Sequence, residues 1–436
     1  MTAKLSRPRF VMAVLASMFI WAILVTFAPL TGLGGMKVDG TGSDAFAKAT
    51  REVAEDHRGN LALVLIENGN VAQSHTMSIG KPVSGDSMFQ MASVSKWVTA
   101  WGVMALVEAG KVDLDAPVSR YVKRWKLPRG DYPNEQVTVR RLLSHTAGLT
   151  DDLGYCGFPP EAKLQPIEES LSRAGDACPL RTGAVRVGDV PDSWRHSGGG
   201  YTLLQLMIEE VSGEPFVNYM ESAVLKRLGM ENSTFRTGAA GAADIAEFFG
   251  TDGGVAPHYR YTAAAAASLY SSANDMARFA QAHMEGPNGE VPGRGVIRPG
   301  LLATMRAPEA ELFGSAHWGL GVQLFAKSTR GDFIYGHNGG NVPAVSNTVR
   351  IEAATGDAIV ALSTGGRGIA SKLGSEWTAQ RRAAITPAMI YGTALRLTSP
   401  AESLLPFLWI VGGWGIILAG SLWFRRRDLS RHPRAS

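Results

Sequence analysis

Two long apolar runs without charged residues lie near the two ends of the chain, at residues 10–30 and 403–424. As helices, each would span roughly 30 Å, about the thickness of the hydrocarbon core of a bilayer. Basic residues precede the first run and follow the second, so the positive-inside rule places both tails in the cytoplasm. We therefore predict two transmembrane helices in the cytoplasmic membrane, with the intervening chain exported to the periplasm. A cleaved signal peptide is the alternative for residues 1–36, and it predicts export as well.

The chain between these runs shows strand patterns toward both ends and helical patterns in its middle. Residues 60–68 and 71–79, separated by a Gly-Asn pair, predict a β-hairpin. Residues 348–352 and 357–363 predict a second pair of strands. Apolar residues recur at helical spacing in four further segments, which are 94–108, 201–211, 215–228 and 276–283.

This order of strands and helices predicts an α+β fold. We expect an antiparallel sheet sandwiched by helices, with the two chain ends supplying the edges of the sheet and a helical subdomain inserted between them. Residues 37–48 are expected to form a flexible linker. The globular domain is then expected over residues 49–390, and residues 425–436 form a basic cytoplasmic tail.

The positive charge of the chain is concentrated in its tails. The formal net charge is +4 at pH 7, and basic residues cluster before the first apolar run and after the second. The segment between the runs is therefore slightly acidic. A nucleic-acid-binding protein would carry an excess of Lys and Arg on its folded body, so we predict no nucleic-acid partner.

Cys156 and Cys178 are the two cysteines of the sequence. In an oxidising compartment they could form a disulfide whose loop closure is worth about 3 kcal/mol in the chain-entropy model. Two separate buried thiols are the alternative. Two thiols without a neighbouring histidine pattern are too few ligands for a metal, so no metal site is expected here.

The segment Ser93-Val94-Ser95-Lys96 is an S-x-x-K sequence at the predicted start of the helix 94–108. Three residues apart on a helix, a hydroxyl and an amine share one face, and the amine can accept the hydroxyl proton if burial lowers its pKa. Free N–H groups at a helix start also favour a developing oxyanion. A capping serine followed by a surface lysine has the same spacing, so the motif needs support from other residues.

That support comes from three later motifs, which together with the segment Phe89 to Lys96 resemble the serine β-lactamase-related family. This family includes class C β-lactamases, D-alanyl-D-alanine carboxypeptidases, esterases and penicillin-binding proteins. The later motifs are Leu142 to Leu149 (LLSHTAGL), similar to LLxHTSGL; His196-Ser197-Gly198, where the family has Y-S-N or Y-S-G; and His337 to Gly340 (HNGG), similar to K-T-G or H-x-G. The match extends over about residues 50–385 and implies a β-lactamase/transpeptidase-like fold.

The resemblance also implies roles for individual residues. Ser93 would be the acylated nucleophile and Lys96 its proton acceptor. The backbone N–H groups of Ser93 and Gly340 would form the oxyanion hole. His337 would line the pocket and could hold a substrate carboxylate or polarise the hydroxyl network, while Gly339 and Gly340 would let a substrate approach the strand. Neither a cofactor nor a metal is expected.

The sequence departs from the family pattern at two positions. His196 stands in place of a tyrosine that moves the proton between nucleophile and leaving group, and a histidine with a pKa near ~6.5 could do this work at neutral pH. Such a shuttle predicts an acidic limb in kcat/KM. Gly198 lacks the amide of the family asparagine, which weakens the case for lactam hydrolysis. Two further residues have structural interpretations: His145 is expected to tether a buried turn, and Tyr201 to open a helix packed on the core.

We therefore predict a membrane-tethered, extracytoplasmic serine hydrolase. It would act through an acyl-enzyme on the peptide, ester or lactam carbonyl of a small-molecule or peptide substrate. The alternative is a catalytically impaired, penicillin-binding-like sensor or scaffold at the membrane, and His196 and Gly198 motivate it. The sequence names neither the substrate nor the oligomeric state.

Overall fold

The computed structural model describes residues 36–40, 42–151, 155–179, 181, 183–236, 244–341, 344–366 and 368–384. These residues belong to one compact unit, Met36–Ala384. Both predicted membrane spans and the basic tail lie outside the described residues, as does the end of the predicted domain after residue 384. Among the residues that are described, no helix combines the length and the apolar character needed to cross a bilayer.

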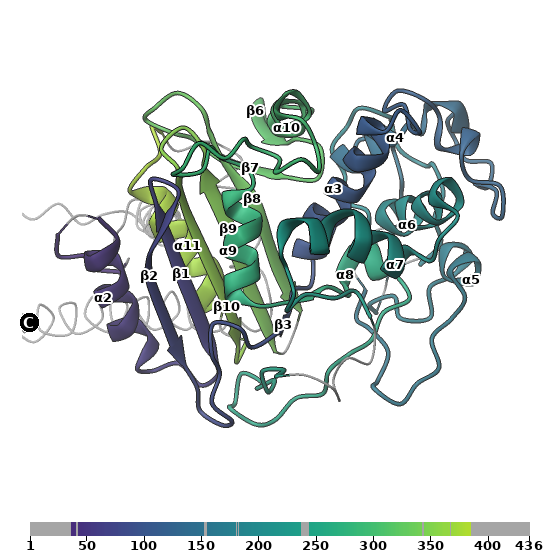
Figure 1. Cartoon of the computed structure of the whole chain (residues 1–436). Helices are drawn as coiled ribbons and strands as arrows, with labels where there is room; N and C mark the ends of the chain where they lie inside the picture. The colour runs from purple at the N-terminus through teal and green to yellow at the C-terminus, as the bar shows by residue number, and fades with distance from the viewer. Residues whose placement is uncertain are drawn as a thin grey trace, which may run out of the picture. The chain divides into compact units, whose positions relative to one another are not determined.

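Within the described residues, eight strands form one sheet in which every neighbouring pair is antiparallel (Figure 1). In sheet order the strands are β2 (Asn70–Met77), β1 (Leu61–Glu67), β10 (Asp357–Thr364), β9 (Val345–Glu352), β8 (Phe333–Asn341), β7 (Gln323–Lys327), β6 (Ser315–Trp318) and β5 (Ala310–Leu312). The predicted hairpin and the predicted late strand pair are both confirmed. The expectation that the chain ends supply the sheet edges is confirmed for β2, from the first hairpin, and wrong for the other edge, which is β5 because β10 pairs with β1 inside the sheet.

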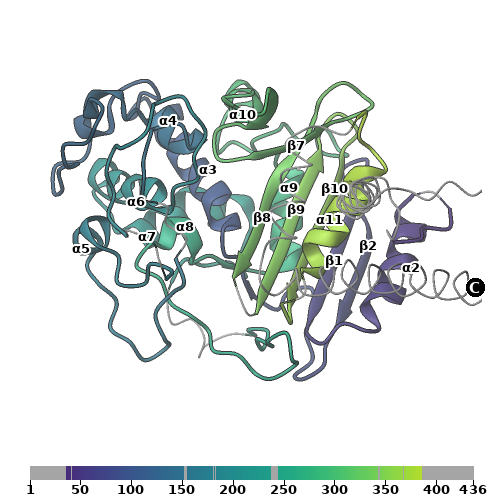
Figure 2. The same cartoon turned by 180° about the vertical axis from the view of Figure 1, so that it is seen from behind.

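The strand β1 shows how the sheet is buried on both faces. Its sequence LALVLIE is almost continuously apolar, as expected for a strand covered on two sides. Leu61, Leu63 and Leu65 pack in a cluster with the helices α2 (Gly42–Ala54) and α11 (Ile369–Ala379). The alternate residues Ala62, Val64 and Ile66 belong to the larger core on the other face, which includes α3 (Val94–Glu108) and α9 (Ala273–Gln281). Figure 2 shows the face that α11 covers.

The helix α2 corrects the predicted linker over residues 37–48. Phe46 and Ala47 are buried against β1 and α11, so the second half of that segment is part of the folded body. The first described residue, Met36, is hydrogen-bonded through its backbone to the carboxylate of Glu376 in α11. The first described residue therefore meets α11, the last helix of the described body, on the same face of the sheet.

The predicted helical subdomain lies beside the sheet (Figure 1). Besides α3, its helices are α4 (Val139–Ser144), α5 (Ile167–Ser172), α6 (Gly198–Ser212), α7 (Phe216–Met220) and α8 (Ala264–Ala267). The predicted helix 94–108 is confirmed at both ends. The helix predicted over 201–211 begins three residues earlier, because the Ser197 side chain accepts the N–H of Gly200 and caps α6. The segment predicted over 215–228 divides into α7, a π-helical turn (Glu221–Leu225) and a 3-10 turn (Lys226–Leu228).

Shorter elements complete the body. The strands β3 (Phe89–Gln90) and β4 (Tyr270–Ser271) pair in a two-stranded sheet. The chain passes from β3 into α3 and from β4 into α9. The helix predicted over 276–283 is α9, which begins three residues earlier at Ala273 because the side chain of Ser272 accepts the N–H of Asp275 and caps it. The helix α10 (Pro299–Arg306) precedes β5.

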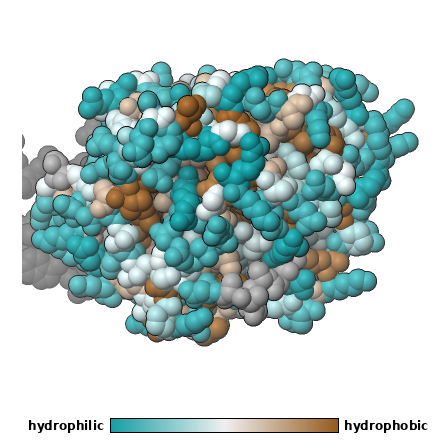
Figure 3. Space-filling model, viewed as in Figure 1, coloured by the Kyte–Doolittle hydropathy of each residue, from teal (hydrophilic) through white to brown (hydrophobic). Residues whose placement is uncertain are grey.

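The predicted disulfide between Cys156 and Cys178 is present and closes the segment that carries α5. On the face of the molecule in Figure 3, polar side chains cover most of the surface, and apolar side chains form small separate groups.

Candidate active site

The S-x-x-K residues lie where the chain passes from β3 into α3. Ala92, immediately before Ser93, has a φ of 47°, a left-handed conformation that is uncommon for a residue with a side chain. The neighbouring Ser95 stabilises this turn, because its hydroxyl donates to Ala92 O at 2.6 Å and accepts the N–H of Leu269 at 3.0 Å. Ser93 itself is the N-cap of α3, and it is only partly buried. The loop thus presents the Ser93 hydroxyl at a helix start.

Lys96 is in hydrogen-bond contact with that hydroxyl. Its Nζ lies 3.0 Å from Ser93 Oγ and donates to Ala266 O at 2.9 Å, and the residue is 3% exposed. Burial lowers the pKa of Lys96 to about 7, although the nearby charge of Asp151 acts in the opposite direction. This shift raises the neutral fraction at pH 7 from roughly one lysine in 3,000 to about half. A lysine in this state can accept the proton of Ser93.

The end of β8 passes very close to the loop before Ser93. A Cβ on Gly339 would lie 2.1 Å from Met91 O, so this position requires glycine. Pairing with β7 covers β8 only from Phe333 to Gly336. Beyond it, Asn338 donates its N–H away from β9, to Gln323 Oε1 at 3.0 Å. Backbone N–H groups two residues apart in a strand point the same way, so the N–H of Gly340 also points away from β9. The predicted oxyanion hole requires this direction.

His337 is buried beside Lys96, with 2% of its surface exposed. Its Nδ1 lies 2.6 Å from Asn338 O, and because a carbonyl oxygen can only accept, Nδ1 carries the proton. Burial lowers the pKa of His337 to about 3, so the ring is neutral and Nε2 is an acceptor. That Nε2 is buried and has no hydrogen-bond partner among the described residues. A neutral acceptor does not suit a substrate carboxylate, the ligand suggested by the resemblance.

His196 lies at the same site, just before the start of α6. Burial lowers its pKa to about 3, and the positive charge of Lys96 acts in the same direction. The side chain is therefore neutral throughout the physiological range, and the acidic limb expected from its reference pKa is not expected from the structure. The ring centroid lies 4.8 Å from that of His145. Gly198, two residues later, is buried as the first residue of α6.

Asp151 is a further residue of the site, which the sequence patterns do not indicate. It is a fully buried carboxylate two residues after the LLSHTAGL motif. It accepts the hydroxyl of Ser197 at 2.7 Å and raises the pKa of Lys96. Its Oδ2 would lie 2.1 Å from a Cβ on Gly199, which explains the glycine at that position. The one available signal was that Asp151 lies two residues after a recognised motif, because the burial of an acid is not visible in a single sequence.

His145 lies as expected, and Tyr201 packs on the core as expected but does not open its helix, because α6 begins three residues earlier at Gly198. His145 is buried and ends α4 in a left-handed conformation, with a φ of 60°. Tyr201 is fully buried in α6, donates to Leu143 O at 3.1 Å, and lies with its ring centroid 5.8 Å from Lys96 Nζ. In the described part of the chain, no group of three or more His, Cys, Asp or Glu side chains could hold a metal ion.

Comparison with known proteins extends these observations. The family model described as Beta-lactamase matches residues 46–382. Penicillin-binding protein 4 of Amycolatopsis lactamdurans is 26% identical over 334 residues, which cover 72% of this chain and 82% of that protein. Esterase EstB of Burkholderia gladioli is 31% identical over 168 residues, but these cover only 36% of this chain and 40% of the esterase.

Among solved structures, the octameric penicillin-binding protein homologue from Pyrococcus abyssi superimposes with a TM-score of 0.60 at 22% identity, over 78% of each chain. At that identity the likeness concerns the fold. The family match covers most of the described body and includes every motif of the site. The chain belongs to the Beta-lactamase family.

Proposed function

We propose that this protein is a serine hydrolase that acts through an acyl-enzyme on ester or amide carbonyls. The observation that carries the proposal is the contact between Lys96 Nζ and Ser93 Oγ at 3.0 Å, with the lysine buried and its pKa lowered to about 7. A nucleophile with an adjacent base that is half neutral at pH 7 is the requirement for acyl transfer.

The chemistry would run in two steps. Lys96 accepts the proton as Ser93 Oγ bonds to the substrate carbonyl carbon, and the N–H groups of Ser93 and Gly340 stabilise the oxyanion. The bond to the leaving group then breaks, and the proton passes from Lys96 to the leaving group by way of His196. A neutral imidazole can accept at one nitrogen and donate from the other, so a low pKa does not exclude this relay. Water attacks the resulting ester, which releases the acid and restores the Ser93 hydroxyl.

The surroundings favour substrates without a carboxylate at His337. The neutral His337 ring has a hydrogen-bond acceptor at Nε2, whereas a substrate carboxylate needs a donor or a cation as its partner. Gly198 supplies no side chain to hold an amide in the substrate. These features favour esters and simple amides over β-lactams, a preference consistent with the similarity to an esterase.

We also propose that the domain works outside the cytoplasm, tethered at the cytoplasmic membrane. The apolar runs at residues 10–30 and 403–424 and the basic residues beyond them support this location. The disulfide between Cys156 and Cys178 is compatible with an oxidising compartment. An export-dependent phosphatase fused after residue 60 should be active, and the same fusion after residue 427 should be inactive. Activity at both positions would refute the second span.

The catalytic proposal is tested with a fluorescent penicillin, a fluorophosphonate and an activated ester, each followed over time. We expect covalent labelling of wild type by the fluorophosphonate, weaker labelling by the penicillin, loss of labelling in Ser93→Ala, and release of product from the ester. Labelling that persists at full strength in Ser93→Ala would assign the nucleophile to another residue. Stable labelling without any product release would support the sensor or scaffold instead. The observation in favour of that alternative is the low pKa of His196, which leaves its ring neutral.

A further inference from the structure

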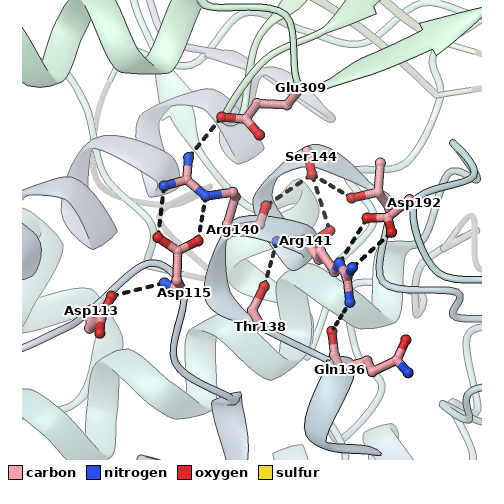
Figure 4. A network of polar contacts seen from close by, with 10 residues as sticks. Asp113, Asp115, Gln136, Thr138, Arg140, Arg141, Ser144, Asp192 and Glu309 are labelled. Atoms are coloured by element: carbon pink, nitrogen blue, oxygen red, sulfur yellow. Dashed lines mark hydrogen bonds and ion pairs between the residues drawn. The ribbon is translucent and has the colours of Figure 1, made fainter. Parts of the chain in front are cut away.

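The short helix α4 carries two consecutive arginines that face an open cavity of about 400 Å³ (Figure 4). Arg140 pairs with Asp115 and with Glu309. Arg141 forms a bidentate pair with Asp192, from Nε to Oδ1 at 2.9 Å and from Nη2 to Oδ2 at 2.8 Å. The two guanidinium groups are thus committed to carboxylates from different parts of the chain.

The carboxylates that pair with the two arginines lie in different segments of the chain, and only one of these segments leads to His196. Asp115 lies in the loop after α3, whereas Asp192 lies four residues before His196, in the loop that leads into α6. Asp192 has a φ of 75°, an unusual backbone conformation for a residue with a side chain. Its N–H donates to Thr146 O at 2.8 Å, so both the backbone and the side chain of Asp192 are bound to α4 and the residues that follow it.

The C-terminal end of α4 holds the same loop at a second place. His145 O accepts the N–H of Arg195 at 2.8 Å, and His145 Nδ1 accepts the N–H of Ser197 at 3.2 Å. The residues on both sides of His196 are therefore hydrogen-bonded to one residue. The two imidazole rings lie with their centroids 4.8 Å apart, tilted by 35°.

We propose that α4 is the positioning element for His196: Arg141 and His145 hold the loop from Asp192 to Ser197 so that the His196 ring faces Lys96 and the Ser93 hydroxyl. This inference rests on the proposed function, because it assigns the proton relay to His196. Arg141, Asp192 and His145 are positioning residues that act through His196 and touch no reacting atom.

The protonation state of His145 suits this task. Because Nδ1 accepts the Ser197 N–H, a neutral ring carries its proton on Nε2. Burial keeps the pKa of His145 well below its ordinary value, and repulsion from Lys96, and from His196 whenever that ring is protonated, acts in the same direction. Protonation of Nδ1 would destroy the acceptor, so the lowered pKa of His145 extends toward lower pH the range over which the loop stays attached.

The cavity provides a matched control for the test. Asp192→Asn and Asp115→Asn each remove one exposed carboxylate from a bidentate pair with neighbouring arginines, and asparagine tolerates the positive φ at position 192. Asp192 is 72% exposed in its side chain, and Asp115 is 69% exposed. Arg140 keeps its pair with Glu309 in Asp115→Asn, and Arg141 keeps its hydrogen bond to Gln136 O in Asp192→Asn. Asp115→Asn therefore controls for the removal of an exposed carboxylate beside α4, and not for the loss of every carboxylate contact of one arginine.

The experiment measures the acylation rate of the full chain with a simple amide, whose leaving amine must be protonated, in wild type and in a His196→Phe background. We expect Asp192→Asn to lower the rate about twofold to fivefold, the population shift that an exposed ion pair can supply, and Asp115→Asn to leave it unchanged. In the His196→Phe background, Asp192→Asn should cause no further loss, because it acts through the missing ring. The same loss in both backgrounds would overturn the proposal.

A second variant pair tests the other attachment. We expect His145→Phe, which keeps a ring but removes the acceptor, to lower acylation by roughly 10²-fold. His145→Asn should retain more activity, since asparagine adopts a positive φ readily and its Oδ1 can accept the Ser197 N–H. An equal loss in both variants would contradict the role of Nδ1.

A measurement without turnover separates this inference from the proposed function. The ring resonances of His196, recorded by NMR, should shift or broaden in Asp192→Asn and remain in place in Asp115→Asn. Unchanged resonances in both variants would overturn the positioning role even if the enzyme is active. If wild type forms no acyl-enzyme while the resonances respond as expected, the proposed function fails and the positioning of His196 stands.

Discussion

The substitution Asp151→Asn tests whether electrostatics set the base at the active site. The carboxylate of Asp151 raises the pKa of Lys96, while burial lowers it to about 7. Asparagine is nearly the same size, and its Oδ1 can still accept the hydroxyl of Ser197. The substitution therefore removes a charge with little change in shape, and the pKa of Lys96 should fall further.

The magnitude follows from the requirement that the base be neutral. In wild type the acylation rate should rise with pH and reach a plateau above about pH 7, and at pH 5 it should be roughly 1% of the plateau. In Asp151→Asn the rising limb should move to lower pH, so the rate at pH 5 should increase relative to the plateau. The neutral His196 and His337 should add no limb between pH 5 and 9.

The assay is single-turnover acylation by an activated ester, measured by stopped flow between pH 5 and 10, with denaturation curves at the extremes to show that both proteins stay folded. A limb near pH 10 in wild type would mean that Lys96 is an ordinary lysine or is not the base. A limb that stays in place or moves upward in Asp151→Asn would refute the electrostatic account of its pKa.

Further substitutions test separate parts of the argument. Lys96→Ala should lower acylation by at least ~10²-fold with the fold intact, as measured by circular dichroism and labelling kinetics. His196→Tyr should keep substantial turnover, and His196→Phe should lose most of it; equal turnover in wild type and His196→Phe would remove His196 from the mechanism. Gly339→Ala should abolish acylation, because its Cβ would lie 2.1 Å from Met91 O. Burial raises the pKa of Asp176 to about 6, so its contribution to stability is greatest below pH 3.8 and is lost as the pH rises through 6. Asp176→Asn should therefore gain about 3 kcal/mol more in urea denaturation at pH 8 than at pH 3, and an equal change at both pH values would contradict the buried charge.

Long periodic segments and motif order were predictable from the sequence. The helix over 94–108 repeats apolar residues at helical spacing, and the strands around 61–67 and 357–364 contain nearly continuous apolar runs. Sheet order was not predictable, because the pairing of β1 with β10 joins residues almost 300 positions apart and no local pattern encodes it. The helix α2 was missed because its buried face consists mainly of small residues beside one phenylalanine, Phe46.

At the site, spacing predicted which residues could meet but not the protonation states in which they meet. Ser93 and Lys96 are three residues apart on one helix, so their contact follows from helix geometry. The low pKa values of His196 and His337 arise from burial by elements distant in sequence. The predicted acidic limb for His196 rested on the reference pKa of histidine and is therefore not expected. Asp151 was not predicted for the same reason, because its burial also comes from elements distant in sequence.

The contact between Met36 and α11 has a consequence for how the domain can be rearranged. Met36 and Glu376 are hydrogen-bonded on the face of the sheet that α2 and α11 cover, whereas Ser93 belongs to the opposite face. Adjacent ends make a domain suitable for circular permutation and for insertion into a host loop. A linker that passes from residue 36 to residue 384, eight positions beyond Glu376, should therefore close the chain, and new ends opened in an exposed turn far from Ser93 should leave the catalytic face unobstructed.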